Sequence, residues 1–160
     1  QSDFYNWLSN WNYDKDSRFK IKTLFARLLK FSLEDDKLIQ KPTITTINSN
    51  LIAGLELDHL VPQNPREPSM LSVTEQDREL YIHSLANMMP LPKKQNIQKS
   101  NYPLEDSIKF YEESGLDKHF LIVQIKELLE EARADSGSPS KFFSTRKKEL
   151  IKYFQQIVEF

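Results

Sequence analysis

The segment 55–63, Leu-Glu-Leu-Asp-His-Leu-Val-Pro-Gln, constrains the fold of this chain most strongly. Leu55 and Leu57 alternate with polar residues, which is the period-two pattern of a half-buried strand. Prolines at positions 62, 65 and 68 then enforce irregular backbone. The strand must therefore end close to Asp58 and His59, which places an acid and an imidazole at the end of a strand.

A hairpin and a helix are predicted around this segment. The short apolar run Leu85–Leu91 ends in proline, which fits a second strand antiparallel to the first. From Asn96 a short helix can continue as far as Pro103, which suits the first turn of the next helix. The sequence therefore predicts a strand–strand–helix core over residues 51–102.

Helices are expected on both sides of this core, because apolar residues recur at helical spacing. A helix in the lead-in, residues 1–50, is expected to end in the charged run 34–37 and to be followed by a polar loop over 41–50. The run Ser72–Glu75 resembles a capping box for a helix reaching about Ile82. Together with the helical flank 103–160, these patterns predict one α+β, mainly helical domain over residues 1–160. The apolar positions that mark the helices are Ile21, Leu24, Phe25, Leu28 and Leu29, then Leu104, Ile108 and Tyr111, then Leu121, Ile125, Leu128, Leu129 and Ala132, and finally Leu150, Phe154, Ile157 and Val158.

Composition excludes several classes of protein. There is no cysteine, so disulfides and cysteine-bound zinc are impossible. No apolar run approaches the roughly 20 residues of a membrane-spanning helix. The net charge of −1 means that binding to nucleic acid would depend on local clusters of basic residues. The chain begins at Gln1 without an initiator methionine, so we expect it to be the C-terminal part of a longer protein.

The chemistry of the central residues suits phosphodiester hydrolysis, which needs an activated water and charge relief on the phosphate. His59 is a natural base near neutral pH, because an unperturbed imidazole has a pKa of about 6.5. Asp58 and Asn96 supply hard oxygen ligands of the kind that Mg²⁺ or Mn²⁺ prefers. Asp58 and His59 could face one site only if the strand ends or bulges there, because neighbours on a regular strand point to opposite faces.

These residues resemble the HNH (ββα-metal, His-Me finger) nuclease pattern: Asp58-His-Leu-Val-Pro-Gln63, then Asn87, then Asn96-Ile-Gln-Lys-Ser-Asn101. The sequence from Ile82 to Leu91 resembles even more closely the GmrSD-type C-terminal nuclease domain of restriction and Ssp-type phage-defence proteins. The motif covers about residues 55–104, and the helix from Phe143 to Leu150 is a weaker match.

The resemblance implies that His59 is the general base and that Asp58 and Asn96 hold Mg²⁺ (or Mn²⁺). It implies that Asn87 fixes the loop between the strands and helps to orient the imidazole. Ala86 stands where the family usually has glycine, and a positive φ there would strain an alanine.

Two basic clusters are candidates for DNA contacts. Lys93, Lys94 and Lys99 surround the second asparagine, which favours contact with phosphate. The cluster at Lys141, Arg146, Lys147, Lys148 and Lys152 is more simply explained as a solvated helix face, although Arg146 is kept as a candidate DNA contact.

We therefore expect a metal-dependent HNH endonuclease that nicks DNA, acting as the effector domain of a prokaryotic restriction or anti-phage protein. The resemblance implies a ParB-like nucleotide-handling domain preceding it in the same protein, a cytoplasmic location without membrane contact, and a possible dimer. A catalytically inactive DNA-binding or scaffold module of the same fold, and an RNA-cutting nuclease, are the alternatives.

Overall fold

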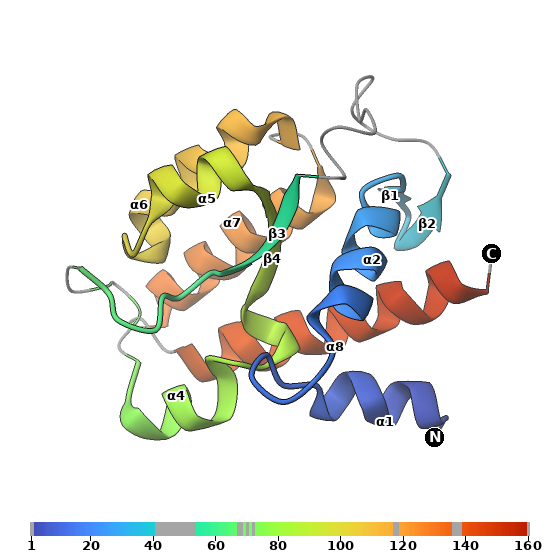
Figure 1. The fold of residues 1–160 in the computed structure, drawn as a ribbon, viewed down its shortest axis with the longest axis horizontal. Coiled ribbons are helices and arrows are strands. Elements are labelled where there is room, and N and C mark those ends of the chain that lie inside the picture. Colours follow the sequence, from blue (N-terminus) through green and yellow to red (C-terminus); the bar gives the residue numbers. More distant parts are fainter. Residues whose placement is uncertain are drawn as a thin grey trace.

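A computed structural model describes residues 2–40, 54–66, 69, 71, 73–116, 119–135 and 139–159. The fold is α+β and mainly helical, as predicted (Figure 1). The described residues form two small antiparallel sheets, whereas the sequence predicted one hairpin. The predicted polar loop over residues 41–50 lies outside the described residues. In chain order the elements are α1 (Asp3–Asn10), α2 (Arg18–Leu28), β1 (Ser32–Glu34), β2 (Lys37–Ile39), β3 (Leu55–His59), α4 (Glu75–Tyr81), the 3-10 turn η1 (Leu85–Asn87), β4 (Met88–Pro92), α5 (Lys93–Lys99), α6 (Leu104–Tyr111), the π-helical turn η2 (Glu112–Leu116), α7 (Phe120–Ala134) and α8 (Pro139–Val158).

The β3–β4 hairpin and α5 form the predicted strand–strand–helix unit, although α5 runs from Lys93 to Lys99 and so begins and ends earlier than the predicted helix from Asn96 to Pro103. The strands pair antiparallel, from Leu55 opposite Pro92 to His59 opposite Met88. Helix α5 begins directly after Pro92 and packs against both strands, while α2 also contacts both strands (Figure 1). The second strand is shorter than predicted, because residues 85–87 form the turn η1 and pairing begins at Met88. Ala86 lies in this 3-10 turn and is not among the positive-φ residues, so alanine fits there without strain.

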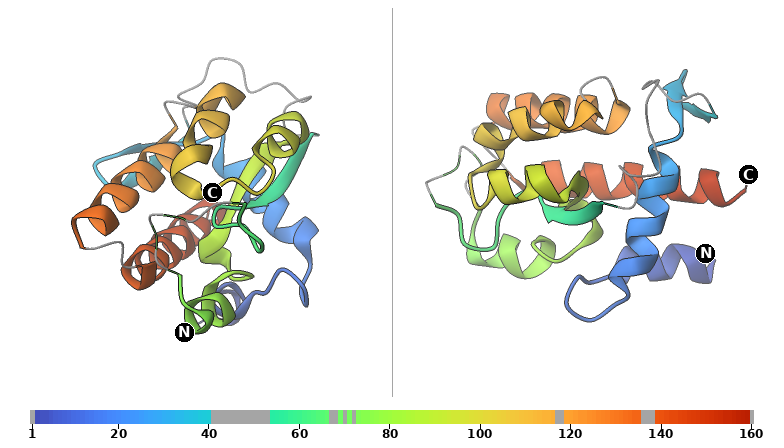
Figure 2. Two further views of the ribbon diagram at one scale, coloured as in Figure 1. Left: turned by 90° about the vertical axis from the view of Figure 1, so that its left-hand side faces the viewer. Right: turned by 45° about the horizontal axis from the view of Figure 1, so that its top comes forward.

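Helix α8 is the long helix against which much of the domain packs. Its buried face is mainly aromatic and aliphatic, and it contacts α1, α2, α4, α7, η1 and β2. Figures 1 and 2 show α8 crossing the molecule, with α1 lying along it and α2 crossing it. Phe25 of α2 meets Phe154 of α8 edge to face, at a ring-centre distance of 5.1 Å. Helix α8 therefore joins the lead-in helices α1 and α2 to η1, the turn from which β4 begins.

Two local predictions are corrected by the structure. The run 34–37 was expected to end a helix, but it forms the turn of the β1–β2 hairpin. Asp35 and Asp36 both adopt positive φ, 49° and 60°, which suits a two-residue hairpin turn that aspartate tolerates. The capping box of α4 is formed by Thr74 and Asp77, two residues later than the expected box starting at Ser72, which lies outside the described residues.

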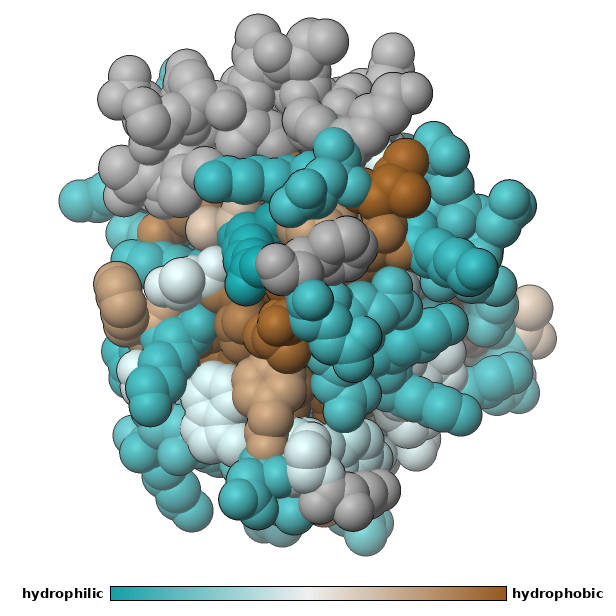
Figure 3. Space-filling model, turned by 90° about the vertical axis from the view of Figure 1, so that its right-hand side faces the viewer, coloured by the Kyte–Doolittle hydropathy of each residue, from teal (hydrophilic) through white to brown (hydrophobic). Residues whose placement is uncertain are grey.

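The surface near the C-terminus of α8 is mostly hydrophilic, with apolar side chains showing between the polar ones (Figure 3). Among the described residues, none of the helices is both long enough and apolar enough to cross a membrane.

Candidate active site

The site lies where β3 ends. The ladder partners of Asp58 and His59 are Met89 and Met88, and after His59 the chain leaves the sheet. The backbone N–H of Leu60 donates to the carbonyl of Asn87 at 2.9 Å, which closes the hairpin at this end. Because the strand stops here, Asp58 and His59 both line one open cleft of about 430 Å³. The other lining residues are Pro62, Gln63, Asn64, Ser100 and Asn101.

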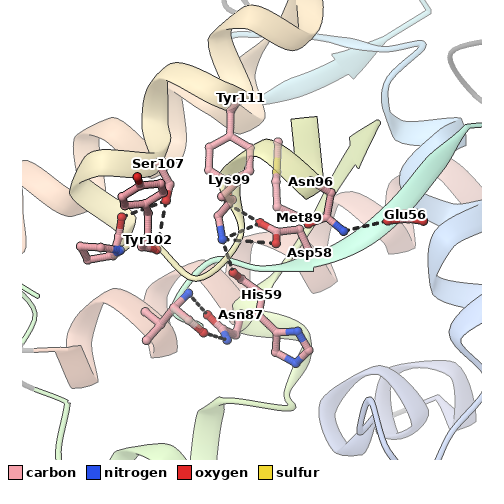
Figure 4. Close-up of polar contacts among 12 residues, drawn as sticks. Glu56, Asp58, His59, Asn87, Met89, Asn96, Lys99, Tyr102, Ser107 and Tyr111 are labelled. Atoms are coloured by element: carbon pink, nitrogen blue, oxygen red, sulfur yellow. Dashed lines mark hydrogen bonds and ion pairs between the residues drawn. The ribbon is translucent and has the colours of Figure 1, made fainter. Parts of the chain in front are cut away.

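Asp58 is buried and bound to a buried lysine. The Nζ of Lys99 lies 3.2 Å from one carboxylate oxygen and 3.1 Å from the other, and it also donates to the His59 carbonyl at 2.9 Å (Figure 4). The hydroxyl of Tyr111 donates to Oδ2 of Asp58 at 2.5 Å. Burial raises the pKa of Asp58, and Lys99 and Tyr111 offset part of that rise. Burial and the adjacent carboxylate likewise raise the pKa of Tyr111.

His59 points away from this ion pair (Figure 4). Its Nε2 lies 3.3 Å from Nδ1 of His83 and 3.5 Å from the amide nitrogen of Gln63. The ring of Tyr13 meets it edge to face at 4.5 Å. Burial, followed by the charges of His83 and Lys99, lowers the pKa of His59 to about 4, so the imidazole is neutral at physiological pH. A neutral imidazole has one nitrogen lone pair available as a base.

Asn87 is fully buried and fixes the segment after His59. Its Oδ1 accepts from the N–H of Val61 at 2.8 Å, and its Nδ2 donates to the carbonyls of Val61 and Ile82 at 2.9 and 3.0 Å. These contacts are those expected of a residue that holds the loop between the strands. The contacts of Asn87 join the backbone of Val61, just after His59, to that of Ile82, just before η1, and so hold the two segments together.

Asn96 contacts Glu56, two residues before Asp58 on β3. Its Nδ2 donates to Oε2 of Glu56 at 2.7 Å, which leaves its amide oxygen for another partner. Glu56 and Asp58 are two residues apart on one strand, so they share a face, and Asn96 and Lys99 share a face of α5. Asn96 and Glu56 line a second cleft of about 380 Å³, on the side of Tyr13 and Lys22. The structure therefore pairs Asn96 with Glu56 and Asp58 with Lys99.

The four basic residues expected to contact DNA divide into two groups. Lys93 and Lys94 are exposed at the start of α5. Lys99 and Arg146 are both completely buried. Arg146 donates to the carbonyl of Ala86 at 2.7 Å, and burial lowers its pKa to about 9. A buried side chain cannot reach a phosphate from this position, so we correct the prediction for Lys99 and Arg146. Both make polar contacts inside the protein.

Three site residues were missed from the sequence. Tyr13, Asp14 and His83 surround His59, and the Nε2 of His83 lies 3.2 Å from Oδ2 of Asp14. No spacing pattern links residues 14, 59 and 83, and only the tertiary fold brings them together.

A model of the family described as GmrSD restriction endonucleases, C-terminal domain, matches residues 1–152, and the chain therefore belongs to that family. Membership implies nuclease activity in general and DNA as the substrate. Restriction nucleases commonly use divalent metals. Neither a search of curated proteins nor a search of solved structures gave a match.

Proposed function

We propose that this domain is a metal-dependent endonuclease of the HNH type that nicks DNA, with His59 as the general base. The observation that carries the proposal is the position of His59: a neutral imidazole at the end of a hairpin, in an open cleft that it shares with the Asp58 carboxylate. In the proposed reaction, His59 removes a proton from a water that attacks the phosphorus, and the 3′ oxygen leaves. The buried Asn87 keeps the backbone at Val61 and Ile82 fixed during this step.

The ligand chemistry around Asp58 fits Mg²⁺ or Mn²⁺. We propose that Asp58 and Asn96 hold the ion, with Glu56 next to Asn96 as a further oxygen donor. Among the described residues, no group of three or more His, Cys, Asp or Glu side chains is placed to hold a metal, so water must supply the remaining ligands. Such an ion, when bound, relieves charge on the phosphate and on the departing oxygen.

Lys99 has a direct bearing on this proposal. Its ammonium already contacts both oxygens of Asp58, so a divalent ion must compete with it for that carboxylate. Metal affinity therefore depends on the cost of moving Lys99. A single ion serves one strand at a time, and we expect nicks from one domain and double-strand breaks only from two sites or from a dimer.

The biological setting follows from the family. We propose that the domain is the effector of a prokaryotic restriction or anti-phage protein that acts in the cytoplasm. In this proposal, a ParB-like nucleotide-handling domain of the same protein selects the DNA that is cut.

The test is conversion of supercoiled plasmid to the open-circular form, with Mg²⁺, with Mn²⁺ and with EDTA. We expect nicking with either ion and none with EDTA. His59→Ala should lower the rate by at least ~10²–10⁴-fold, the usual contribution of general-base catalysis. Lys148→Ala, an exposed change on α8, is the control and should cut normally. His59→Ala nicking at the wild-type rate would overturn the mechanism, and cleavage of RNA alone would overturn the substrate.

A further inference from the structure

We propose that Asp14 and His83 form a hydrogen-bond relay that fixes the orientation and the tautomer of His59. The inference rests on the proposed role of His59 as the base, and it assigns positioning roles to two residues, Asp14 and His83, to which the family motif gave none. The relay consists of two contacts: His59 Nε2 to His83 Nδ1 at 3.3 Å, and His83 Nε2 to Asp14 Oδ2 at 3.2 Å.

The direction of the relay follows from its acidic end. An ionised Asp14 can only accept a hydrogen bond, so the Nε2 of a neutral His83 carries the proton and its Nδ1 carries a lone pair. That lone pair accepts from Nε2–H of His59. The Nδ1 of His59 is then the nitrogen without a proton, and it can act as the base. An acid sets the tautomer of the histidine in the Ser-His-Asp triad by the same logic.

The contact with Gln63 is compatible with this direction. The Gln63 amide nitrogen lies 3.5 Å from His59 Nε2, which is at the limit of a hydrogen bond. The two ends of an amide side chain are assigned from the surrounding network. With its amide reversed, Gln63 presents an oxygen that accepts the same N–H of His59.

Backbone contacts hold the loop 12–16 against His83. The N–H of Tyr13 donates to the His83 carbonyl at 2.8 Å, and Asn12 forms an antiparallel bridge with Ser84. The side chain of Asn12 accepts from the N–H of Asp14 at 2.9 Å, which shapes the turn that presents the carboxylate. The lead-in segment is thus docked to the residues before η1 at the point where the relay forms.

Aromatic packing restricts the two imidazoles further. The ring of Tyr13 stacks on His83, with 17° between the planes, and meets His59 edge to face. The guanidinium of Arg18 covers Tyr13 at 3.9 Å. The side chain of Asp14 is 58% exposed, and a polar contact so open to water adds little stability. The role of Asp14 is therefore to set which nitrogen of His83 carries the proton, not to stabilise the fold.

The decisive variant is Asp14→Asn. The amide of asparagine can donate to His83 Nε2, which moves the proton of His83 to Nδ1 and that of His59 to its own Nδ1. We expect kcat to fall roughly 10–100-fold, the usual range when the partner of a functional imidazole is lost. KM should stay unchanged, because DNA binding does not use these atoms. Asp14→Glu keeps the carboxylate and should retain most activity.

The tautomer can be observed directly by ¹⁵N NMR of the histidine rings in the same 160-residue protein. We expect the His59 proton on Nε2 in the wild type and on Nδ1 in Asp14→Asn. Asp36→Asn is the matched control, because Asp36 is an exposed aspartate in the β1–β2 turn, where asparagine also accepts positive φ. It should change neither the rate nor the spectrum.

The outcomes separate the relay from the proposed function. If Asp14→Asn and His83→Leu cut at the wild-type rate while His59→Ala does not, the relay is wrong and His59 remains the base. If His59→Ala itself cuts normally, the proposed function fails, and the NMR spectra alone decide whether the relay exists. A wild-type proton on Nδ1 of His59 overturns the relay whatever the rates show.

Discussion

Replacing Lys99 with methionine tests the ion pair at the centre of the site. Methionine keeps much of the volume of lysine and removes its charge, so Asp58 stays buried with the Tyr111 hydroxyl and the backbone of His59 as its remaining donors. The side chains of Lys99 and Asp58 are 1% and 6% exposed, so water cannot replace the ammonium. Removing one partner of a buried pair costs about 3–5 kcal/mol, and we expect Lys99→Met to lose about 3 kcal/mol of unfolding free energy at pH 8.

The loss should depend on pH in a defined direction. Burial already raises the pKa of Asp58, and loss of Lys99 raises it further. An acid with a raised pKa in the folded state destabilises the protein at high pH and recovers stability as protonation begins. The deficit of Lys99→Met should therefore shrink as pH falls through the raised pKa of Asp58 towards 3.8, its ordinary value.

The same variant tests the metal proposal. With Lys99 absent, a divalent ion can take its place at Asp58, and Mg²⁺ at 100 times its Kd would add about 2.7 kcal/mol. The measurement is urea unfolding followed by circular dichroism, at pH 8 and pH 5, with and without Mg²⁺. In Asp58→Asn combined with Lys99→Met, the ion should have no such effect. Lys94→Met, an exposed change on the same helix, should stay within about 0.5 kcal/mol of wild type.

Two results would refute this reasoning. Wild-type stability of Lys99→Met at pH 8 would show that Asp58 does not depend on Lys99. Equal stabilisation by Mg²⁺ with and without the Asp58 carboxylate would remove Asp58 from the metal site.

Three further predictions concern residues around the site. Changing Lys93 and Lys94 together to Gln should weaken DNA binding about equally across sequences and reduce its salt dependence, whereas Lys148→Gln on α8 should do neither. If gel shifts show the same loss of DNA affinity in both variants, Lys93 and Lys94 are not specific DNA contacts. Arg146→Met should reduce stability but leave the DNA affinity of the folded protein unchanged, and a gel-shift loss in folded protein would contradict its interior role. Burial lowers the pKa of His119 to about 4, so its contribution to the free energy of unfolding is full above pH 6.5 and is lost as pH falls towards 4. His119→Gln should therefore remove about 2 kcal/mol of the change in unfolding free energy between pH 7.5 and pH 5, measured by urea unfolding. An unchanged pH dependence in this variant would exclude His119 as its source.

The hairpin and α5 were predictable because their signals are local. The alternation at Leu55 and Leu57 and the closing prolines define a strand end, and the motif then places Asp58, His59 and Asn96 on their elements. The burial of Lys99 was not predictable, since lysine is almost never fully buried without a partner, and its partner Asp58 lies 41 residues away. Composition gave no hint that a charged residue would sit inside.

The other differences between the sequence-based predictions and the structure also arise from long-range contacts. The run 34–37 has residues that suit the end of a helix, and pairing between β1 and β2 overrides that preference. His83 has no local pattern at all. Its partners come from a loop some 70 residues earlier and from a strand on the far side of a long connection. A sequence motif can list the chemical groups of a site, but the residues that orient them are chosen by packing.

The contacts of α8 also determine when the enzyme can become active during synthesis. A ribosome adds roughly 5–20 residues per second, and the chain emerges N-terminus first. The turn η1, which precedes β4, is held through the Ala86 carbonyl by Arg146 of α8, and α1 and α2 pack on the same helix. Every residue of the proposed site, from Asp14 to Asn96, is therefore made before the helix that stabilises its surroundings. A nascent chain lacking α8 should remain an incomplete nuclease, which delays DNA cleavage until the domain has been fully translated.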